Sequence, residues 1–432
     1  MKIKTEYLGR VEGEAGFRFR TKDGRLEELE INIWEPPRFF EGMLVGRRYD
    51  EAPDIVARIC GICPVSHMLT SIRAIEKAIH FEPGPETQAA RKIMACSQIA
   101  SSHLVHLVML ALPDYEGKDS MMELLTEKGK DAFFKKFIRV KEVFNGITRA
   151  FGGRALHPVS MVVGGFTSAP GKKEIDGLLS GLASSESDLE DIIGTMSGLK
   201  PPRLETGSEL VCLSDDGGYA INEGRIVSSM GLNAMEDEYE GLFEEREAAY
   251  SNAKKTTLTQ RGQIMTGAMA RVGLKSGRLG TKARKLAFSA GLVTETNTIG
   301  KNKNPFHNIM AQAVELLHFA QECKNLLEIA RASAGTKAGT GPLRPSPPPR
   351  EGEGKALTEA PRGLLYHSYT LDRMGTIRKA NIVTPTAHNY LAMEQDLRRL
   401  IEDNINLPAE GLRSLAGMLI RAYDPCFSCS VH

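Results

Sequence analysis

The sequence lacks an excess of charge, a signal-peptide core and a long apolar run. Its 432 residues include 55 basic and 54 acidic side chains, a balance that argues against a nucleic acid or an acidic membrane surface recognised through bulk charge. The first residues, Met1–Glu6, contain no apolar core of a signal peptide. The most apolar stretch, Leu104–Leu112, is much shorter than the roughly 20 residues that span a bilayer. We therefore expect a cytoplasmic protein with no transmembrane segment and no nucleic-acid partner.

Cysteine is scarce, and its arrangement argues against a disulfide framework. The chain has seven cysteines, an odd number. Three of them, Cys96, Cys212 and Cys323, stand alone and far apart, which indicates a reducing compartment and the role of small core residues. The other four form two CxxC pairs, one near each end of the chain. Since a CxxC turn brings two sulfurs to the same ion, these pairs are candidates for a metal site.

Each CxxC pair is followed by a histidine. The first pair lies in Arg58–His67, which reads RICGICPVSH, and the second in Asp424–His432, which reads DPCFSCSVH. Zinc modules usually separate their pairs by roughly 15–20 residues, whereas most of this chain lies between Cys63 and Cys426. A site that joins both ends of a large domain would be buried at its centre, a position that favours catalysis over local stabilisation. The spacing leaves a zinc site, an iron–sulfur cluster and a nickel site open.

The pattern of apolar residues predicts an α+β protein that is predominantly helical. Lys2–Leu8 and Phe17–Trp34 alternate as strands do, and Asp23 and Gly24 supply a turn, so we expect an N-terminal antiparallel β-sheet. Helical periodicity follows, and its longest segments predict a central bundle of long helices. The predicted helices are Met68–Ile79, Glu86–Leu112, Lys173–Gly198, Met235–Lys254, Phe306–Ser333, Ala387–Ile401 and Ala409–Arg421, and short strands are predicted within Gly207–Val227 and Thr376–Val383.

A segment rich in glycine and proline, Gly335–Gly354, interrupts the helical patterns. Such a composition is typical of a loop or an extended connector. The two cysteine pairs lie on either side of it and would have to meet for a metal to bind. We therefore expect a single catalytic domain over residues 1–432, with residues 335–354 as a surface loop within it.

The two cysteine segments match a pair of signatures, RxCGxCxxxH and DPCxxCxxH, and other segments agree in order along nearly the whole chain. These segments are Gly9–Gly13, Gly152–Gly165 and Glu359–Gly363. In these residues the chain resembles the large (alpha, catalytic) subunits of nickel-iron hydrogenases, and with Phe39–Gly42 it most resembles the cytoplasmic, cofactor-coupled type. The resemblance implies the nickel-iron hydrogenase large-subunit fold and the reversible heterolytic cleavage of H2 to protons and electrons.

The resemblance also implies a Ni–Fe centre held by four thiolates. Cys60 and Cys426, the first cysteine of each pair, would bind nickel terminally, and Cys63 and Cys429 would bridge nickel and iron. The iron would also carry cyanide and carbon monoxide. The proton released from H2 would go to a thiolate, which metal binding keeps ionised. Glu12 would then take the proton from Cys426, since a carboxyl acts as a relay when burial brings its pKa near the working pH.

Five further residues match family positions around this centre. Arg362 matches an arginine whose guanidinium lies over the open side of the metal pair, where a fixed cation polarises hydrogen or holds displaced charge. Asp424 and Asp114 match the carboxylates around that arginine. His432 resembles a histidine that binds a separate magnesium or iron ion, and Glu41 matches its co-ligand, an oxygen donor of the kind magnesium prefers.

Three other histidines are not expected to bind the metal. His67 ends the first signature, and we expect it to hydrogen-bond to a cysteine sulfur. His103 and His106 lie on an apolar helical segment, and we expect them to be core histidines with satisfied hydrogen bonds.

The two electrons released from H2 need a way out of this chain. Its three single cysteines cannot form a four-cysteine cluster, so we expect a partner that carries iron–sulfur clusters. The resemblance implies that this partner is a small iron–sulfur hydrogenase subunit. Further electron-acceptor subunits would be linked to NAD(P), a deazaflavin, a flavin or ferredoxin, because the chain has no convincing nucleotide-binding fingerprint.

Two other functions agree with parts of this pattern. A metal-free structural relative in a respiratory complex would keep the fold, but all four cysteines are intact here. A zinc-stabilised interaction protein would use the thiolates, but six soft ligands exceed the four of a tetrahedral zinc site. Glu12 and Arg362 would then have no role. The sequence therefore favours a catalytic subunit.

Overall fold

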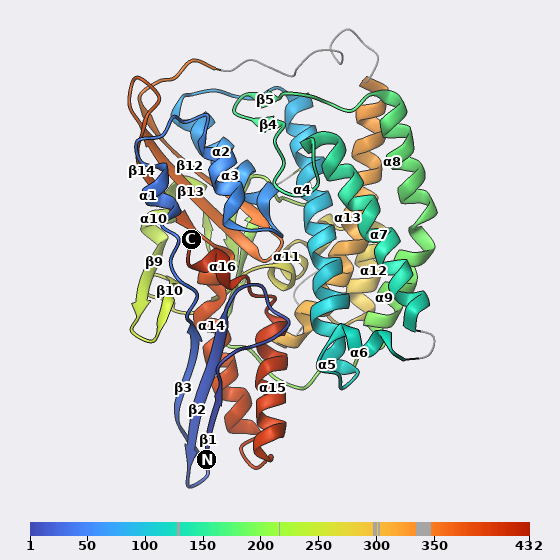
Figure 1. The fold of residues 1–432 in the computed structure, drawn as a ribbon, viewed down its shortest axis with the longest axis vertical. Coiled ribbons are helices and arrows are strands. Elements are labelled where there is room, and N and C mark those ends of the chain that lie inside the picture. The colour runs from blue at the N-terminus through green and yellow to red at the C-terminus, as the bar shows by residue number, and fades with distance from the viewer. Residues whose placement is uncertain (128–129, 216, 297–299, 301–302, 334–346) are drawn as a thin grey trace.

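The computed structural model describes residues 1–127, 130–215, 217–296, 300, 303–333 and 347–432 (Figure 1). Its longer helices are α3 (Pro64–Ala78), α4 (Pro85–Val105), α7 (Lys130–Gly152), α8 (Lys172–Ser184), α9 (Glu186–Ser197), α11 (Ala268–Lys275), α12 (Thr281–Ser289), α13 (Asn308–Ser333), α14 (Pro385–Asp403) and α15 (Ala409–Ala422). Its short helices are α1 (Phe40–Leu44), α2 (Ala52–Val56), α5 (Leu112–Tyr115), α6 (Met121–Leu125), α10 (Tyr239–Leu242) and α16 (Phe427–Ser430). Its strands are β1 (Lys2–Thr5), β2 (Ala15–Lys22), β3 (Arg25–Ile33), β4 (Met161–Val162), β5 (Gly165–Phe166), β6 (Glu209–Ser214), β7 (Arg225–Ser228), β8 (Asn233–Ala234), β9 (Phe243–Ala248), β10 (Ser251–Leu258), β11 (Ile264–Met265), β12 (Gly352–Ala360), β13 (Gly363–Leu371) and β14 (Ile377–Val383).

Long helices form a bundle on one side of the molecule (Figure 1). Helix α4 packs against α7 and α13, and α13 also packs against α8, α9 and α12. The helices predicted at Glu86–Leu112 and Phe306–Ser333 correspond to α4 and α13. The segment predicted as one helix at Lys173–Gly198 is divided at Ser185 into α8 and α9.

Helix α4 continues through a π-helical segment, His106–Ala111, into α5. The second residue of α5 is Pro113, which has no N–H to donate to the preceding turn. Helix irregularities concentrate at proline and at π-helical turns. Among the described residues, Pro85–Tyr115 is the one helical stretch with the length and mean hydropathy to cross a membrane, but 78% of its apolar window is buried inside the protein. Core helices of globular proteins have the same properties.

The N-terminal segment forms an antiparallel sheet of strand order β1-β2-β3. Asp23 and Gly24 connect β2 to β3 with φ angles of 49° and 72°, the positive values that two-residue hairpin turns prefer. Strand β3 packs against α14. Glu394 of α14 accepts a hydrogen bond from the Ile31 N–H at 3.2 Å, which ties the sheet to the C-terminal part of the chain.

A second antiparallel sheet, β12-β13-β14, packs on α3. Strand β12 lies so close to this helix that a Cβ at Gly354 would be 1.9 Å from the carbonyl oxygen of Ala74. Of the loop predicted at 335–354, residues 335–346 lie outside the described residues, and residues 352–354 belong to β12 instead. The glycines at the end of this segment therefore permit close packing of a strand on a helix.

The helix predicted at Met235–Lys254 is wrong. This part of the chain contains the short helix α10 and the antiparallel hairpin β9-β10. Strand β10 buries Ala253 and Leu258 and packs against α14 and β3. Tertiary contacts of this kind override a local helical preference.

Other elements carry weak sequence signals. No helix is predicted over α7, although its buried residues recur at helical spacing, because lysine and arginine residues interrupt them. These buried residues are Phe137, Val140, Phe144, Ile147 and Phe151. Strands β12 and β13 are buried on both faces along most of their length, so they lack the alternation that marks a half-exposed strand.

Three segments from distant parts of the chain meet near the centre of the molecule. They are the loop that precedes β2, the turn that precedes α3, and the C-terminal helix α16. Figure 1 shows α16 near the middle of the view, below α3 and above α14, with the C-terminus beside it. Buried apolar side chains from Ile3 to Val431 belong to one cluster, so the segments share a common core.

The close packing of β12 on α3 predicts that Gly354→Ala destabilises the protein. The added methyl group cannot fit against the Ala74 carbonyl, so the strand must move, and we expect the free energy of unfolding to fall by about 1–3 kcal/mol. Denaturant unfolding measures this change. Gly177→Ala in α8 is the matched control, since no atom beyond its own helix backbone and chain neighbours lies within 4 Å of its new Cβ. Equal unfolding midpoints for the two variants would contradict the packing argument.

Candidate metal centre

The four cysteines of the two CxxC pairs converge in the folded chain. Their sulfur atoms all lie within 4.8 Å of one another, and all four residues are buried. The Sγ atoms of Cys60 and Cys426 are 3.5 Å apart, and those of Cys63 and Cys429 are 3.6 Å apart. Such separations suit thiolates on a shared ion with metal–sulfur bonds of about 2.3 Å.

The first CxxC turn is shaped by the start of α3. Pro64 begins the helix, and Cys63 occupies the N-cap position. The backbone N–H groups of Ile62 and Cys63 donate hydrogen bonds to the Cys60 sulfur at 3.2 and 3.3 Å. Hydrogen bonding from Cys63 lowers the pKa of the Cys60 thiol. The turn thus favours the thiolate form of Cys60 that a metal requires.

The two ends of the chain are joined by backbone contacts at Glu12. This residue forms an isolated parallel bridge with Cys426, and its carbonyl oxygen accepts a hydrogen bond from the Phe427 N–H at 2.8 Å. Gly13 follows with φ at 84°, and a Cβ there would lie 2.4 Å from the Ser428 nitrogen. The glycine of this motif therefore allows the N-terminal loop to lie against the second cysteine pair.

The carboxylate of Glu12 reaches the metal centre. Its Oε2 atom lies 2.8 Å from the Cys426 sulfur, within reach of a proton carried by that sulfur. Its Oε1 atom accepts a hydrogen bond from the Ser428 hydroxyl. Glu35 lies beside the same loop, where it accepts a hydrogen bond from the Glu14 N–H at 3.0 Å. Burial raises the pKa of Glu35, so a second carboxyl able to hold a proton lies beyond the first.

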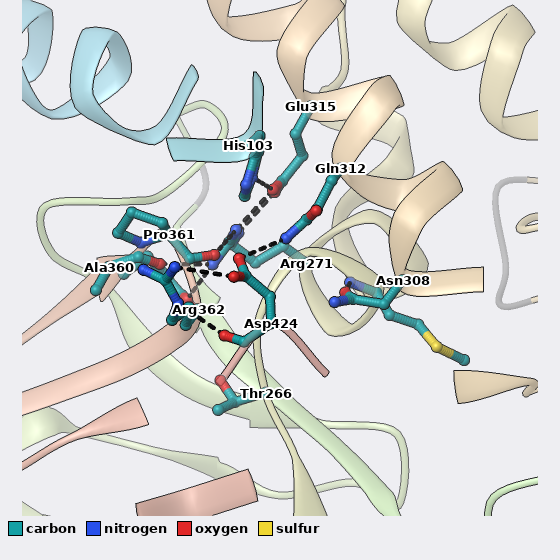
Figure 2. Close-up of polar contacts among 12 residues, drawn as sticks. His103, Thr266, Arg271, Asn308, Gln312, Glu315, Ala360, Pro361, Arg362 and Asp424 are labelled. Atoms are coloured by element: carbon teal, nitrogen blue, oxygen red, sulfur yellow. Dashed lines mark hydrogen bonds and ion pairs between the residues drawn. The ribbon is translucent and has the colours of Figure 1, made fainter. Parts of the chain in front are cut away.

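Arg362 is a buried cation held by Asp424. Its Nε donates to the Asp424 carbonyl oxygen at 2.7 Å, and its Nη2 donates to the carboxylate at 2.9 Å. The amide of Gln312 donates to the other carboxylate oxygen at 2.9 Å (Figure 2). Burial opposes the charge, but Asp424 and the thiolates of Cys63 and Cys60 raise the pKa of Arg362 above its ordinary value. Its Nη1 has no partner among the described residues, so one N–H face is free to meet a ligand at the centre.

Asp114 lies in a different network from the one expected. Its carboxylate binds Arg10 at 2.5 Å and Arg421 at 2.6 Å, and these are its ion-pair partners within the described part of the chain. Arg362 is held by Asp424 alone of the two carboxylates. Asp114 follows the π-helical segment, which carries it to the loop before Glu12 rather than to the β12–β13 turn. It therefore ties two segments that lead into the site.

Glu41 and His432, predicted as ligands of a second ion, lie close together in the structure. The Nε2 atom of His432 lies 4.0 Å from Oε1 of Glu41. The other ring nitrogen of His432 bonds to the carbonyl oxygen of Cys429 at 2.8 Å, and Glu41 accepts a hydrogen bond from the Ile382 N–H at 2.7 Å. An ion bound at about 2.1 Å from each donor would fit between them.

His67 is buried beside the first cysteine pair. Its Nδ1 lies 3.3 Å from Nε2 of His367, so its recorded partner is a second histidine and not a cysteine sulfur. Burial lowers the pKa of His67 to about 3, which keeps the ring neutral. Its Nε2 has no hydrogen-bond partner among the described residues.

His103 and His106 are both buried. The prediction of satisfied hydrogen bonds is confirmed for His106, whose two ring nitrogens have partners, but it is wrong for His103, whose Nδ1 has no partner among the described residues. Nε2 of His103 bonds to the Glu315 carboxylate at 2.8 Å, and Nε2 of His106 bonds to the carbonyl oxygen of Arg421 at 2.7 Å. Both residues therefore connect α4 or the π-helical segment to neighbouring elements of the core.

Several polar residues at the centre have no sequence motif. Thr386 accepts a hydrogen bond from the Cys426 N–H at 2.9 Å, and Asn389 donates to the carbonyl oxygen of Arg362 at 3.3 Å. Gln312, which binds Asp424, is a buried polar residue on helix α13. A polar side chain on the apolar face of a predicted helix is a signal that marks such residues.

These features define a class of protein. Four buried sulfurs, a carboxylate within proton-transfer distance of one of them and a buried cation with a free N–H face describe a redox metalloenzyme that moves protons. The chain belongs to the nickel-dependent hydrogenase family, whose model matches residues 38–132 and 232–432.

Relatives with assigned activities agree along the whole chain. The alpha subunit of sulfhydrogenase 1 of Pyrococcus furiosus is 32% identical, and the match covers 100% of this chain and 97% of that relative. An F420-non-reducing hydrogenase subunit of Methanothermobacter marburgensis is 31% identical, with coverage of 100% and 95%. A solved NAD+-reducing NiFe-hydrogenase in the H2-reduced state has a TM-score of 0.87 at 25% identity, with coverage of 100% of this chain and 99% of that chain.

The chain is thus the catalytic large subunit of a nickel-iron hydrogenase, an oxidoreductase that acts on H2. The resemblance found in the sequence motifs is confirmed. The metal-free structural relative and the zinc-stabilised interaction protein are not favoured.

The geometry of Arg362 predicts a specific effect of Arg362→Lys. A lysine ammonium cannot bind both acceptors of Asp424 and keep a planar N–H face free. We expect nickel content to be retained and H2 oxidation per nickel to fall by about 100-fold or more, the usual cost of losing a fixed donor at a reacting centre. Activity assays normalised to nickel test this. Arg73→Lys, which alters a guanidinium bound to Glu236 in a separate network, is the control, and full turnover in Arg362→Lys would remove Arg362 from the mechanism.

Proposed function

We propose that this chain cleaves H2 reversibly at a Ni–Fe centre bound by Cys60, Cys63, Cys426 and Cys429. The observation that carries the proposal is the convergence of their four sulfurs within 4.8 Å. These four cysteines, two from each CxxC pair, would hold the metal pair as thiolates. When bound, the metal pair, with cyanide and carbon monoxide on the iron, supplies the chemistry that splits H2 heterolytically and accepts its electrons.

Glu12 carries the proton away from Cys426. Its carboxylate oxygen is 2.8 Å from the sulfur, a distance over which a proton passes without a bridging water. The second oxygen is held by Ser428, so the carboxylate has a fixed orientation. Glu12 is half-buried, which places it between the enclosed centre and the surface.

Arg362 supplies a fixed positive charge on one side of the centre. Asp424 holds two of its donor groups, and Nη1 has no partner in the part of the chain that the structure describes. A preorganised cation in a buried site stabilises developing negative charge without reorganisation. Asp114 acts indirectly, because it joins Arg10, two residues before Glu12, to Arg421, three residues before Asp424.

A magnesium or iron ion binds between Glu41 and His432. The 4.0 Å separation of their donor atoms supports this assignment, and Glu41 supplies the oxygen that magnesium prefers. The ion would fix the C-terminal residues, which include the ligand Cys429. It would therefore stabilise the second cysteine pair without taking part in the redox step.

A small iron–sulfur subunit receives the electrons, within a cytoplasmic complex in which residues 1–432 form a single catalytic domain. The first CxxC turn reaches the surface at Gly61, so a partner that covers this turn would lie close to the sulfurs. The final acceptor is linked to NAD(P), a deazaflavin, a flavin or ferredoxin. Among the relatives, the beta subunit of NAD-reducing hydrogenase HoxS of Cupriavidus necator belongs to an NAD-reducing enzyme.

Removal of one sulfur tests the metal assignment. We expect Cys426→Ala to lose nickel and H2 uptake, because the centre loses one of four thiolates and the proton carrier next to Glu12. Elemental analysis for nickel, iron and zinc on the purified chain measures this directly. Cys212→Ala, which removes a buried thiol outside the cluster, should retain nickel and iron in near-equal amounts. Unchanged nickel and H2 uptake in Cys426→Ala would refute the proposed centre.

Neutralisation of Glu12 separates proton transfer from metal binding. A carboxamide cannot accept a proton. Glu12→Gln should therefore slow the enzyme-catalysed exchange of hydrogen between H2 and deuterated water by about 10²–10⁴-fold, with nickel content unchanged. Glu14→Gln, two residues further along the same loop, is the control and should keep wild-type exchange. Exchange in Glu12→Gln within twofold of wild type would show that the proton leaves by another route.

A further inference from the structure

Arg271 of α11 is a fully buried arginine that lies outside the residues proposed for catalysis. All five of its N–H donors are used. Nε and Nη2 bind the Glu315 carboxylate, each at 2.6 Å, and Nη1 binds Glu359 at 2.9 Å. The remaining donors bind the carbonyl oxygens of Ala360 and Pro361, each at 3.0 Å. A fixed guanidinium fork thus holds two side chains and two peptide groups at once.

The two carbonyls that Arg271 binds belong to the residues immediately before Arg362. Ala360 is the last residue of β12, and Pro361 and Arg362 form the turn that leads into β13, so both carbonyls lie next to the backbone that carries the Arg362 side chain. Figure 2 shows Arg271 on one side of Ala360 and Pro361, with Arg362 directed from the turn toward Asp424. The orientation of one guanidinium is therefore linked to the position of another through two peptide groups.

Helix α11 contacts the same turn at a second point. Gly267 precedes the helix with φ at 106°, and a Cβ there would lie 2.8 Å from the carbonyl oxygen of Arg362. Asn389 of α14 donates to that oxygen and to the carbonyl oxygen of Thr266, each at 3.3 Å. The backbone on both sides of the Arg362 side chain is thus fixed by contacts with α11 and its N-terminal flank.

The carboxylate that binds Arg271 is itself held from two sides. Glu315 accepts hydrogen bonds from His103 at 2.8 Å and from the Tyr219 hydroxyl at 2.6 Å. The carboxylates of Glu315 and Glu359 raise the pKa of Arg271 against the effect of its burial, so the fork stays charged. Buried ion pairs add little net stability compared with apolar packing, and their best-attested benefit is a unique geometry. This favours a positional function for the network.

We propose that Arg271 is a positioning residue for Arg362 and fixes the distance from the Arg362 guanidinium to the four sulfurs. The inference rests on the proposed function of Arg362. Lysine at position 271 keeps the charge but cannot bind two carboxylates and two carbonyls in one plane. The β12–β13 turn would then shift or fluctuate, and the distance from the Arg362 guanidinium to the four sulfurs would no longer be fixed.

A double-mutant cycle in the assembled enzyme tests this coupling. We expect Arg271→Lys to lower H2 oxidation per nickel by between about tenfold and 100-fold, the effect of small misplacements at a reacting centre. In an Arg362→Lys background the same change should cost less than about twofold, because residues that act through one another are not additive. Arg91→Lys, which alters another buried arginine bound bidentately to Glu76, is the matched control for loss of stability and should keep activity within about twofold. An additive loss in the double variant would overturn the proposal.

Hydrogen–deuterium exchange of the full chain supplies a readout that does not depend on activity. Peptides that cover residues 358–366 should exchange faster in Arg271→Lys and at the wild-type rate in Arg91→Lys. Glu359→Gln, which keeps the side-chain shape, should show the same change to a smaller extent and serves if Arg271→Lys does not fold. Unchanged exchange in these variants would show that Arg271 does not fix the β12–β13 turn, and would reject the proposal. Faster exchange together with full activity of Arg362→Lys would mean that Arg271 does fix the turn. It would instead reject the catalytic role of Arg362.

Discussion

The structure depends on one constraint: sulfurs from the two ends of the chain must lie within 4.8 Å of one another. The entropic cost of closing a chain segment rises only with the logarithm of its length, so closure over most of the chain costs little more than closure over a short loop. What closure requires is a rigid support for both ends. Helix α3 supports the first pair, and the bridge between Glu12 and Cys426 supports the second. The core between them fixes where these supports meet.

A second level of organisation is the pairing of buried charge. The ion pair of Arg362 with Asp424 lies at the metal centre. The ion pairs of Arg271 with Glu315 and Glu359 form a second set, further from the sulfurs. Unpaired charges would be too costly in such a dry interior, so each guanidinium has at least one carboxylate. The two sets of ion pairs are connected through the β12–β13 turn. The electrostatics of the site and the conformation of its backbone are therefore parts of the same network.

Residues inside contiguous motifs could be identified from the sequence, because a motif fixes local geometry and chemistry together. This holds for the convergence of the cysteines, for the contact of Glu12 with Cys426, and for Arg362 beside Asp424. It fails for Asp114, whose partners are set by the phase of a helix, and for Arg271, whose partners come from α13, from β12 and from the turn that follows β12. The hairpin β9-β10 could not be predicted from the local sequence pattern for the same reason, since its strands are stabilised by contacts with α14 and β3. Long-range packing leaves little trace in local periodicity.

The π-helical segment His106–Ala111 has a consequence for how this chain tolerates change in length. An α-helix turns by about 100° per residue, so the wider π turn shifts the phase of every residue that follows it. That shift places Asp114 between Arg10 and Arg421. Loss of a single residue here would restore regular helical phase and rotate the carboxylate away from both arginines. The number of residues in this segment is therefore more constrained than their identity. The segment sets the direction in which Asp114 points around the helix axis, rather than its distance along the axis.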